Sequence, residues 1–265
     1  MPTALLRAIA NTFDRAIVSG EGRAPDPDRA RVEHAVYRQA LLDAGYEIEV
    51  LPADDAHPDC VFIEDTAVVI GSQVVATRPG EPSRRGEVRE VIEHLSGRAP
   101  VSRIEAPGTV EGGDVMILGE RLFVGMSRRT NRDGIDQLRR VAESQGLSVT
   151  AVPVDGVLHL KSGVRPIDDR TVVVTPGTVD ETLLSGLRIV HEPSHERHAF
   201  SALPMSNGKV LVAASAPDTT SLIVDLGANV LPIDVSEIQA ADGGLTCLSI
   251  LIDDPRSQTN ARTTQ

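Results

Sequence analysis

The residue with the clearest chemical potential is Cys247, near the C-terminal end of the 265-residue sequence. It follows a Gly243-Gly244 turn and precedes an apolar run. Because the sequence holds only two cysteines, neither belongs to a disulfide framework. A thiol at the start of a short strand is a candidate nucleophile. A free cysteine is also a common small apolar residue of protein cores, so the neighbouring chemistry must decide.

A histidine and a glutamate upstream could support such a nucleophile. His159 lies between leucines, where it could be a core residue or a general acid and base. Glu111 precedes Gly112-Gly113, and glycines allow other groups to approach the backbone closely. A carboxylate there can hold the second nitrogen of an imidazole. Thiol, imidazole and carboxylate are the three parts of an activated nucleophile.

Two further acids, Glu64 and Asp65, follow the apolar residues 61–63. Buried carboxylates need a partner, which could be an internal arginine or a cationic substrate. A guanidinium carries a planar fork of donors that matches carboxylates. The formal net charge of −12 agrees with a small cation and disfavours nucleic acid and anionic membranes as partners.

These residues are far apart in the sequence, so the fold must bring them together, and a repeat could do so. From Asp65 the pattern predicts strands over 67–70 and 74–77, a helix over 88–95 and a third strand before residue 105. We expect Gly97 to end that helix as a left-handed cap. Similar units begin near residues 111, 159, 203 and 244.

The last unit runs out of chain and can be completed by the N-terminal residues. These supply a strand over 5–8, a helix with Val32, Val36 and Ala40 on one face and Gly45 as its cap, and a strand over 47–51. The sequence therefore predicts an α/β fold of five ββαβ modules closed into a five-bladed α/β-propeller around a central active-site channel. An ordinary open α/β sheet is the alternative.

In a ring, the module starts would converge on one pocket. They carry Glu64 and Asp65, Glu111 and Asp114, His159, Asn207 and Cys247. A purely structural strand would rarely place acids, an imidazole and a thiol at equivalent positions, so the repeat favours a catalytic function.

The remaining composition bounds the setting. Residues 1–255 are expected to form a single domain, with 256–265 as a polar tail. We find no signal peptide and no run long enough to span a membrane, and with two cysteines this points to the cytoplasm. The other cysteine, Cys60, is expected to be structural. The histidines at 191, 195 and 198 do not have the spacing of a helical zinc motif and are expected in a solvated loop.

Several motifs in the same order resemble those of the dimethylarginine dimethylaminohydrolases, members of the guanidino-group-modifying superfamily with a five-bladed α/β-propeller. The resemblance covers nearly the whole chain. It is densest at residues 58–65, 77–80, 83–87, 106–114, 129–131, 157–161 and 242–247.

The resemblance implies a cysteine hydrolase. Cys247 would attack the guanidinium carbon of an Nω-methylated arginine, asymmetric dimethylarginine or monomethylarginine. His159 would protonate the departing dimethylamine or methylamine, then activate the water that cleaves a covalent thiouronium intermediate to citrulline. Glu111 would orient His159. No metal and no organic cofactor is expected.

It also implies how the small-molecule guanidino substrate is bound. Glu64 and Asp65 would hold the guanidinium nitrogens, Asp59 the α-amino group, and Arg84 with Arg129 the α-carboxylate.

The segment 18–25, expected to be a lid over the pocket, is shorter than the family's lid, and Glu21 stands where a leucine would be expected. The exact guanidino substrate is therefore open, with arginine deiminase activity as the nearby alternative and a non-catalytic binding propeller as the alternative of another class. A homodimer is left open as the oligomeric state.

Overall fold

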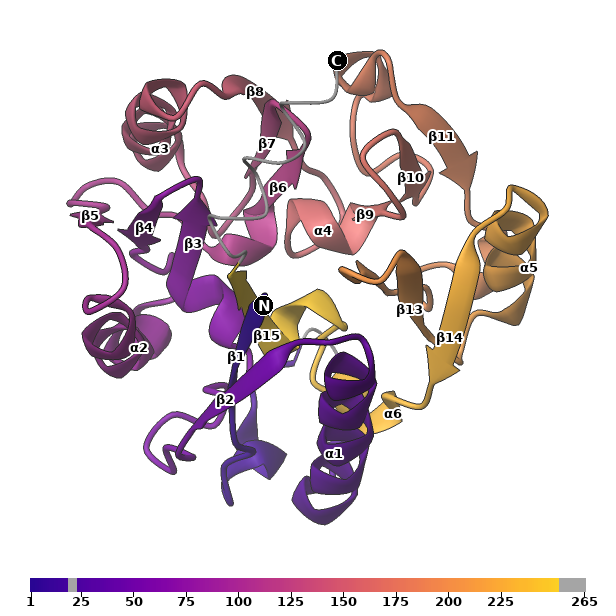
Figure 1. Ribbon diagram of the computed structural model, residues 1–265, viewed down its shortest axis with the longest axis horizontal. Helices are drawn as coiled ribbons and strands as arrows, with labels where there is room; N and C mark the ends of the chain where they lie inside the picture. Colours follow the sequence, from indigo (N-terminus) through magenta and orange to yellow (C-terminus); the bar gives the residue numbers. More distant parts are fainter. Residues whose placement is uncertain (19–22, 253–265) are drawn as a thin grey trace.

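Residues 1–18 and 23–252 are described by a computed structural model, in which they form five three-stranded sheets arranged as a ring (Figure 1). Each sheet has the same topology, with its first strand antiparallel to the second and the second parallel to the third. The predicted five-bladed α/β-propeller is confirmed, and the open-sheet alternative is wrong.

The first blade contains β3 (Ala67–Ile70), β4 (Gln73–Ala76), α2 (Val88–Leu95) and β5 (Val101–Arg103). The second contains β6 (Val115–Leu118), β7 (Arg121–Met126), α3 (Arg132–Ser144) and β8 (Ser148–Pro153). The third contains α4 (Leu160–Gly163), β9 (Val164–Pro166), β10 (Thr171–Val174) and β11 (Arg188–His191), with a 3₁₀ turn (Glu181–Leu184) in place of the outer helix. The fourth contains β12 (Ala202–Pro204), β13 (Lys209–Ala213), α5 (Pro217–Asp225) and β14 (Asn229–Ile233).

The fifth blade joins segments from both ends of the described chain. It contains β15 (Ser249–Ile252), β1 (Thr3–Arg7), α1 (Pro27–Asp43) and β2 (Glu47–Leu51), and Leu5 of β1 pairs with Ile250 of β15. The short helix α6 (Ser236–Ala240) precedes β15. In Figure 1 the longer helices α1, α2, α3 and α5 lie at the rim, while β3, β6, β9 and β15 lie nearer the centre.

Of the two predicted glycine caps, the one at Gly45 is confirmed and the one at Gly97 is not. Gly45, Gly146 and Gly227 have φ angles of +89°, +82° and +94°, which a residue with a Cβ adopts only with strain. Gly97 does not have a positive φ, so its predicted left-handed cap is wrong. Helix α2 instead ends in a turn in which the N–H of Arg98 donates to the carbonyl of Leu95 at 3.0 Å.

The predicted apolar face of α1 is also wrong in part. Val32 and Val36 are exposed by 65% and 46%, whereas Ala40 is buried. The buried side of this helix includes Glu33, whose carboxylate accepts hydrogen bonds from the N–H groups of Glu237 and Ile238. A polar residue on the buried face, satisfied by the first turn of α6, hides the true face from a purely apolar pattern.

Apolar side chains fill the space between neighbouring blades and close the ring. Val91 and Ile92 of the first blade belong to one core cluster with Leu5 and Ile250 of the fifth. Burial of this kind contributes roughly 25 cal/mol for each Å² of apolar surface removed from water. The two ends of the described chain are therefore held into the fold by packing as well as by strand pairing.

Two sequence predictions concern the C-terminal end of the chain. Residues 253–265 lie outside the described residues, so the polar tail and the domain limit at residue 255 stay predictions. Within residues 1–18 and 23–252, no helix has the length and apolar character needed to cross a bilayer.

Candidate active site

A cavity of about 570 Å³ brings together residues from the starts of all five blades. Its wall contains Glu64, Gly113, His159, Ser201 and Cys247, and each of these precedes the first strand of a different blade. The ring thus places a thiol, an imidazole and a carboxylate around one hollow, although they are separated by long stretches of sequence.

The fourth blade corrects the sequence interpretation. Asn207 lies in the exposed turn between β12 and β13, followed by Gly208 with a φ of +78°, and it does not line this cavity. The Asn-Gly pair is a hairpin-turn signal, which we misread as a module start. The cavity position belongs to Ser201, whose Oγ accepts the N–H of Leu245 at 2.8 Å and so holds the loop that carries Cys247.

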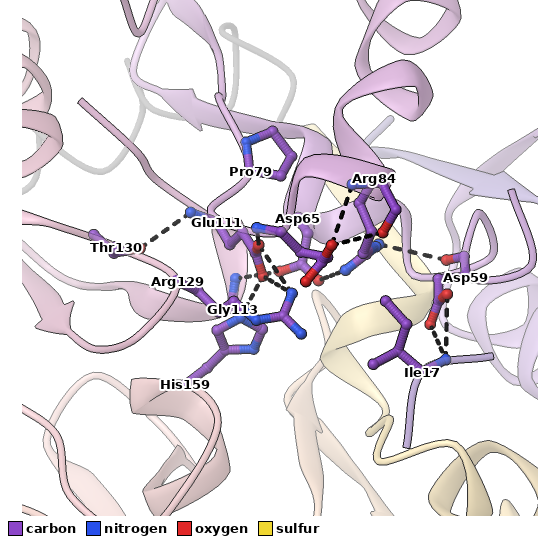
Figure 2. Close-up of polar contacts among 12 residues, drawn as sticks. Ile17, Asp59, Asp65, Pro79, Arg84, Glu111, Gly113, Arg129, Thr130 and His159 are labelled. Atoms are coloured by element: carbon purple, nitrogen blue, oxygen red, sulfur yellow. Dashed lines mark hydrogen bonds and ion pairs between the residues drawn. The ribbon is translucent and has the colours of Figure 1, made fainter. Parts of the chain in front are cut away.

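His159 is oriented by a buried carboxylate, as Figure 2 shows. Its Nε2 lies 2.7 Å from Oε2 of Glu111, and Glu111 is fully buried. The Glu111 backbone is fixed in turn, because its N–H donates to Oγ1 of Thr130 at 3.1 Å. The other ring nitrogen, Nδ1, lies beside Gly113.

The electrostatics favour a protonated imidazole. Burial alone would lower the pKa of His159, but the nearby carboxylates of Asp65, Glu111 and Asp114 outweigh it and raise the pKa to about 9. His159 is therefore an imidazolium at neutral pH, which is the form required of a general acid.

The two glycines after Glu111 are required by close approach. A Cβ on Gly112 would lie 1.9 Å from the carbonyl oxygen of Glu64, and one on Gly113 would lie 2.5 Å from Nδ1 of His159. The N–H of Gly113 also donates to Asp65 at 2.9 Å. Any larger residue here would separate the first three blades at their centre.

Cys247 lies in a tight turn after α6. The N–H of Gly244 faces its Sγ at 3.3 Å, which supplies a donor to sulfur. Burial, followed by the negative charges of Glu64 and Asp65, raises the pKa of Cys247 to about 12. The thiol is therefore protonated in the empty cavity, and a cation placed beside it would lower its pKa.

Glu64 is connected to the Cys247 turn through Thr246, the residue before Cys247. Oγ1 of Thr246 donates to Oε2 of Glu64 at 3.0 Å, and Lys161 forms an ion pair with Oε1. Burial raises the pKa of Glu64, while Lys161 opposes that rise. Our sequence reasoning assigned no role to Lys161 or Thr246. Their positions, two residues after His159 and one before Cys247, were the available signal.

Asp65 and Arg84 form a buried pair beside the site. Nη1 of Arg84 donates to Oδ2 of Asp65 at 2.6 Å, and Nη2 donates to Glu87 at 2.8 Å (Figure 2). Arg84 also donates to the carbonyl of Phe62 at 3.1 Å. These partners occupy the guanidinium that the sequence assigned to a substrate carboxylate, and Glu87 was not foreseen.

Arg129 and Asp59 also have internal partners. Nη1 of Arg129 lies 3.1 Å from Oε1 of Glu111, and both carboxylate oxygens of Asp59 accept the N–H of Ile17 at 3.1 and 3.3 Å (Figure 2). Asp59, Asp65, Arg84, Glu111 and Arg129 do not line the cavity that holds Cys247. The substrate contacts predicted for Asp59, Asp65, Arg84 and Arg129 remain predictions.

The predicted lid is anchored at both ends. Residues 19–22, including Glu21, lie outside the described residues. Before them, Ile17 is bonded to Asp59; after them, Arg23 forms an ion pair with Glu237, and the N–H of Asp26 donates to Glu237 at 2.9 Å. Glu237 belongs to α6, the helix that leads into the Cys247 turn.

Two clusters in the described residues have donors close enough to hold a metal ion. Asp65, Glu111 and His159 form one, and His195, Glu196 and Asp218 the other. In both, the donors already bond to protein groups; Glu196, for example, accepts two N–H groups at the start of α5. Cys60 is buried, and burial raises its pKa to about 11, as suits a structural thiol.

Comparison with known proteins identifies relatives over almost the entire chain. Residues 6–251 match the model of a family described as N,N dimethylarginine dimethylhydrolase, eukaryotic. The N(G),N(G)-dimethylarginine dimethylaminohydrolase of Pseudomonas aeruginosa is 36% identical over 249 residues, which cover 91% of this chain and 97% of that protein. The protein of the same name from Streptomyces coelicolor is 39% identical over 241 residues, covering 87% and 91%.

A solved structure agrees with the fold. A cysteine-to-serine variant of the Pseudomonas aeruginosa protein, complexed with citrulline, superposes with a TM-score of 0.87 at 33% identity. The superposition covers 94% of this chain and 98% of that one.

Proposed function

The chain belongs to the dimethylarginine dimethylaminohydrolase family, and on that premise we propose that it hydrolyses an Nω-methylated arginine to citrulline and dimethylamine or methylamine. The reaction is hydrolysis of a guanidino C–N bond by a cysteine nucleophile. One observation carries the proposal: Cys247, His159 and Glu64 line the same cavity, with the imidazole charged and the thiol neutral before substrate arrives.

The first half of the reaction uses both protonation states. A bound guanidinium cation favours the thiolate of Cys247, and the thiol proton is released to solvent. Sγ then attacks the guanidinium carbon and a C–S bond forms. His159 donates its proton to the methylated nitrogen, the C–N bond breaks, and the amine leaves. A thiouronium remains on Cys247.

The second half reverses the role of the imidazole. His159, now neutral, takes a proton from water while the water oxygen attacks the thiouronium carbon. The C–S bond breaks as the remaining hydroxyl proton of the tetrahedral intermediate passes to the departing sulfur, so that citrulline and the neutral thiol of Cys247 are formed. Glu111 keeps Nε2 occupied throughout, so that Nδ1 serves both proton transfers.

The acids around the cavity would hold the substrate cation. Glu64 is held beside the nucleophile by Thr246, so a guanidinium that it binds would lie next to Cys247. In this proposal Asp65 adds negative charge from behind, while Asp59, Arg84 and Arg129 meet the amino acid end of the substrate. To bind the substrate carboxylate, Arg129 would give up part of its contact with Glu111.

The test is a turnover assay with four substrates. The protein is incubated with asymmetric dimethylarginine, monomethylarginine, arginine or agmatine, and the ureido product and the released amine are both measured. We expect citrulline with dimethylamine or methylamine from the first two. Ammonia release from arginine at a higher rate would replace the proposal with a deiminase.

The two cysteines provide a matched control. Cys247→Ser is expected to lower turnover by roughly 10⁴-fold or more, whereas Cys60→Ser changes a buried thiol outside the cavity and keeps activity. No turnover of any of the four compounds by the unmodified protein would leave a binding propeller as the better explanation.

We also propose that the protein is cytoplasmic and forms a homodimer. Two free cysteines suit a reducing compartment. Val32 and Val36 lie one turn apart on α1 and are exposed, which suits a contact between two copies. Cell fractionation and analytical ultracentrifugation test these two statements separately.

A further inference from the structure

His159 directly precedes a single short helical turn, α4, and the N-terminal end of this turn is held by the carboxylate of Asp114. The N–H of Leu160 donates to Oδ1 of Asp114 at 2.8 Å. Asp114 is fully buried, and Oγ of Ser127 donates to its other oxygen at 2.6 Å. The residue after His159 is thus tied to a fixed point in the second blade.

The other end of the turn is held by an arginine that the proposed function does not use. The N–H of Ser162 donates to the carbonyl of His159 at 3.1 Å, and Nη1 of Arg165 donates to the carbonyl of Ser162 at 2.8 Å. Arg165 is only 3% exposed and lines the cavity that contains Cys247. The turn that carries the imidazole is therefore clamped between a buried anion and a buried cation.

Arg165 is embedded in a buried network. Its Nη2 forms an ion pair with Glu192, and Nη1 also donates to Oγ1 of Thr175 at 2.6 Å. Glu192 accepts from Thr175 at 2.6 Å and from the N–H of His198 at 2.9 Å. Nε of Arg165 is buried and has no hydrogen-bond partner among the described residues.

Such a network is a poor way to gain stability. Burying an ion pair costs desolvation, and well-packed apolar residues in its place are often as stable or more so. The unpaired Nε adds to that cost. The Arg165–Glu192 pair holds the turn that follows His159, so positioning of this turn explains its presence better than stability does.

Arg165 also contacts the segment that supports the nucleophile. Its guanidinium lies over the ring of Phe200, 5.9 Å from the ring centre. The next residue, Ser201, accepts the N–H of Leu245 in the Cys247 loop. Arg165 therefore touches both the His159 turn and the residue that precedes Ser201, the support of the Cys247 loop.

We propose that Arg165, held by Glu192, is a positioning residue that sets the His159 turn against the Cys247 loop. Among the interactions of the described residues, its hydrogen bonds and ion pair go to Ser162, Thr175 and Glu192, and not to Cys247 or Glu111. Without it, the carbonyl of Ser162 loses its partner and the turn relaxes. A displacement of about 1 Å in such a site can cost about 100-fold in rate. The inference rests on the proposed function, because turnover is one of its readouts.

The experiment replaces the pair without leaving a lone buried charge. In Arg165→Met/Glu192→Met both ions are removed together, so that no lone buried charge is left to destabilise the fold. We expect kcat to fall about 10- to 100-fold, KM to stay within about threefold, and the alkaline limb of the kcat–pH profile to move to lower pH as His159 leaves Glu111. The thermal midpoint stays close to that of the unmodified protein.

The chain offers a closely matched control. Arg7 is also buried, forms an ion pair with Glu90 and donates to the carbonyl of Pro52 at 3.0 Å. Within residues 1–18 and 23–252 its Nη1 has no hydrogen-bond partner, and Arg7 does not line this cavity. Arg7→Met/Glu90→Met therefore removes an arginine–glutamate pair elsewhere, with two differences: Glu90 is 42% exposed, and Asp54 remains 3.8 Å from the Arg7 position. It is expected to leave kcat and the pH profile unchanged.

A charge-conserving variant decides the question if the double variant does not fold. Arg165→Lys keeps a cation opposite Glu192 but lacks the second nitrogen for Ser162. We expect a kcat about 5- to 10-fold lower, with part of the alkaline shift.

A folded Arg165 variant with unchanged kcat and pH profile would overturn the inference, as would equal losses in the Arg7 control. If the unmodified protein turned over none of the four compounds, the proposed function would fail instead. The pKa of His159, followed by NMR in the same variants, still tests the positioning in that case.

Discussion

Replacing Glu111 by glutamine tests the electrostatic core of the site. Glu111→Gln keeps the size and shape of the side chain but removes the charge 2.7 Å from Nε2 of His159. Arg129 loses its ion-pair partner too, but it is partly exposed and can be solvated. The change therefore acts mainly on the protonation of the imidazole.

The expected magnitude follows from the pKa of His159. The rise from 6.5 to about 9 in the folded protein corresponds to about 3 kcal/mol of differential stability. Because the folded-state pKa is the higher one, this contribution is fully present below pH 6.5 and is lost as the pH rises through 9. Asp65 and Asp114 remain in the variant, so we expect the pH-dependent contribution to shrink by about 1–2 kcal/mol rather than vanish.

The assay is denaturant unfolding at several values between pH 6 and pH 9.5. In the unmodified protein the free energy of unfolding should decline across this range, and in Glu111→Gln the decline should be shallower. The turnover rate of Glu111→Gln should also decline at lower pH than that of the unmodified protein, because His159 loses its proton at lower pH in the variant. Other titrating groups are common to both proteins and cancel in the difference.

A surface pair serves as the control. Glu181 lies 2.9 Å from the exposed His191, so Glu181→Gln makes the same carboxylate-to-amide change in solvent, where such a pair contributes about 0–1 kcal/mol. If the free energy of unfolding declines with pH equally in the unmodified protein and in Glu111→Gln, the assigned charge state of His159 is refuted. If Glu181→Gln makes the decline as shallow as Glu111→Gln does, the effect does not belong to the buried His159–Glu111 pair.

Three further predictions concern Cys247, Lys161 and Gly112. Iodoacetamide should alkylate Cys247 slowly in the empty protein at pH 7, because a pKa of about 12 leaves a thiolate fraction on the order of 10⁻⁵, and the rate should rise about tenfold for each pH unit; a rate already constant between pH 7 and 9 would contradict this. Lys161→Met should raise KM by about tenfold or more and shift the acid limb of the kcat/KM–pH profile to higher pH. Burial raises the pKa of Glu64, and without Lys161 the cation that opposes this rise is missing. An unchanged acid limb would show that Lys161 does not control the ionisation of Glu64. Gly112→Ala should prevent folding or lower the free energy of unfolding by several kcal/mol, because its Cβ would meet the backbone oxygen of Glu64. The control Gly97→Ala, where space is open and φ is not positive, should be neutral or stabilising. Equal thermal midpoints for the two variants would contradict the close approach at Gly112.

The ring was predictable because its signals are local and repeated. The run Val88, Val91, Ile92 and Leu95 marked the face of one helix, and all four residues are buried. The spacing of the modules then implied closure. Val32 and Val36 misled because the buried face of α1 is fixed by a polar contact, that of Glu33 with α6, and such a contact leaves no apolar pattern.

The internal partners of the site were not predictable. Module starts pointed to Glu64, His159 and Cys247, which do share a cavity. Lys161 pairs with Glu64 across 97 residues, and Arg165 with Glu192 across 27, and neither separation follows any local period. Which of several acids and arginines pair in a crowded centre depends on packing between blades, which a single sequence does not encode in readable form.

The split fifth blade has a consequence for how the protein is made. Strand β1 needs β15 as its antiparallel neighbour, and almost the whole described chain separates them. During synthesis, which proceeds at about 5–20 residues per second, β1 emerges first and must wait for its partner. The proposed nucleophile, Cys247, lies just before β15. The proposed active site is therefore complete only after this strand has been made and has paired with β1.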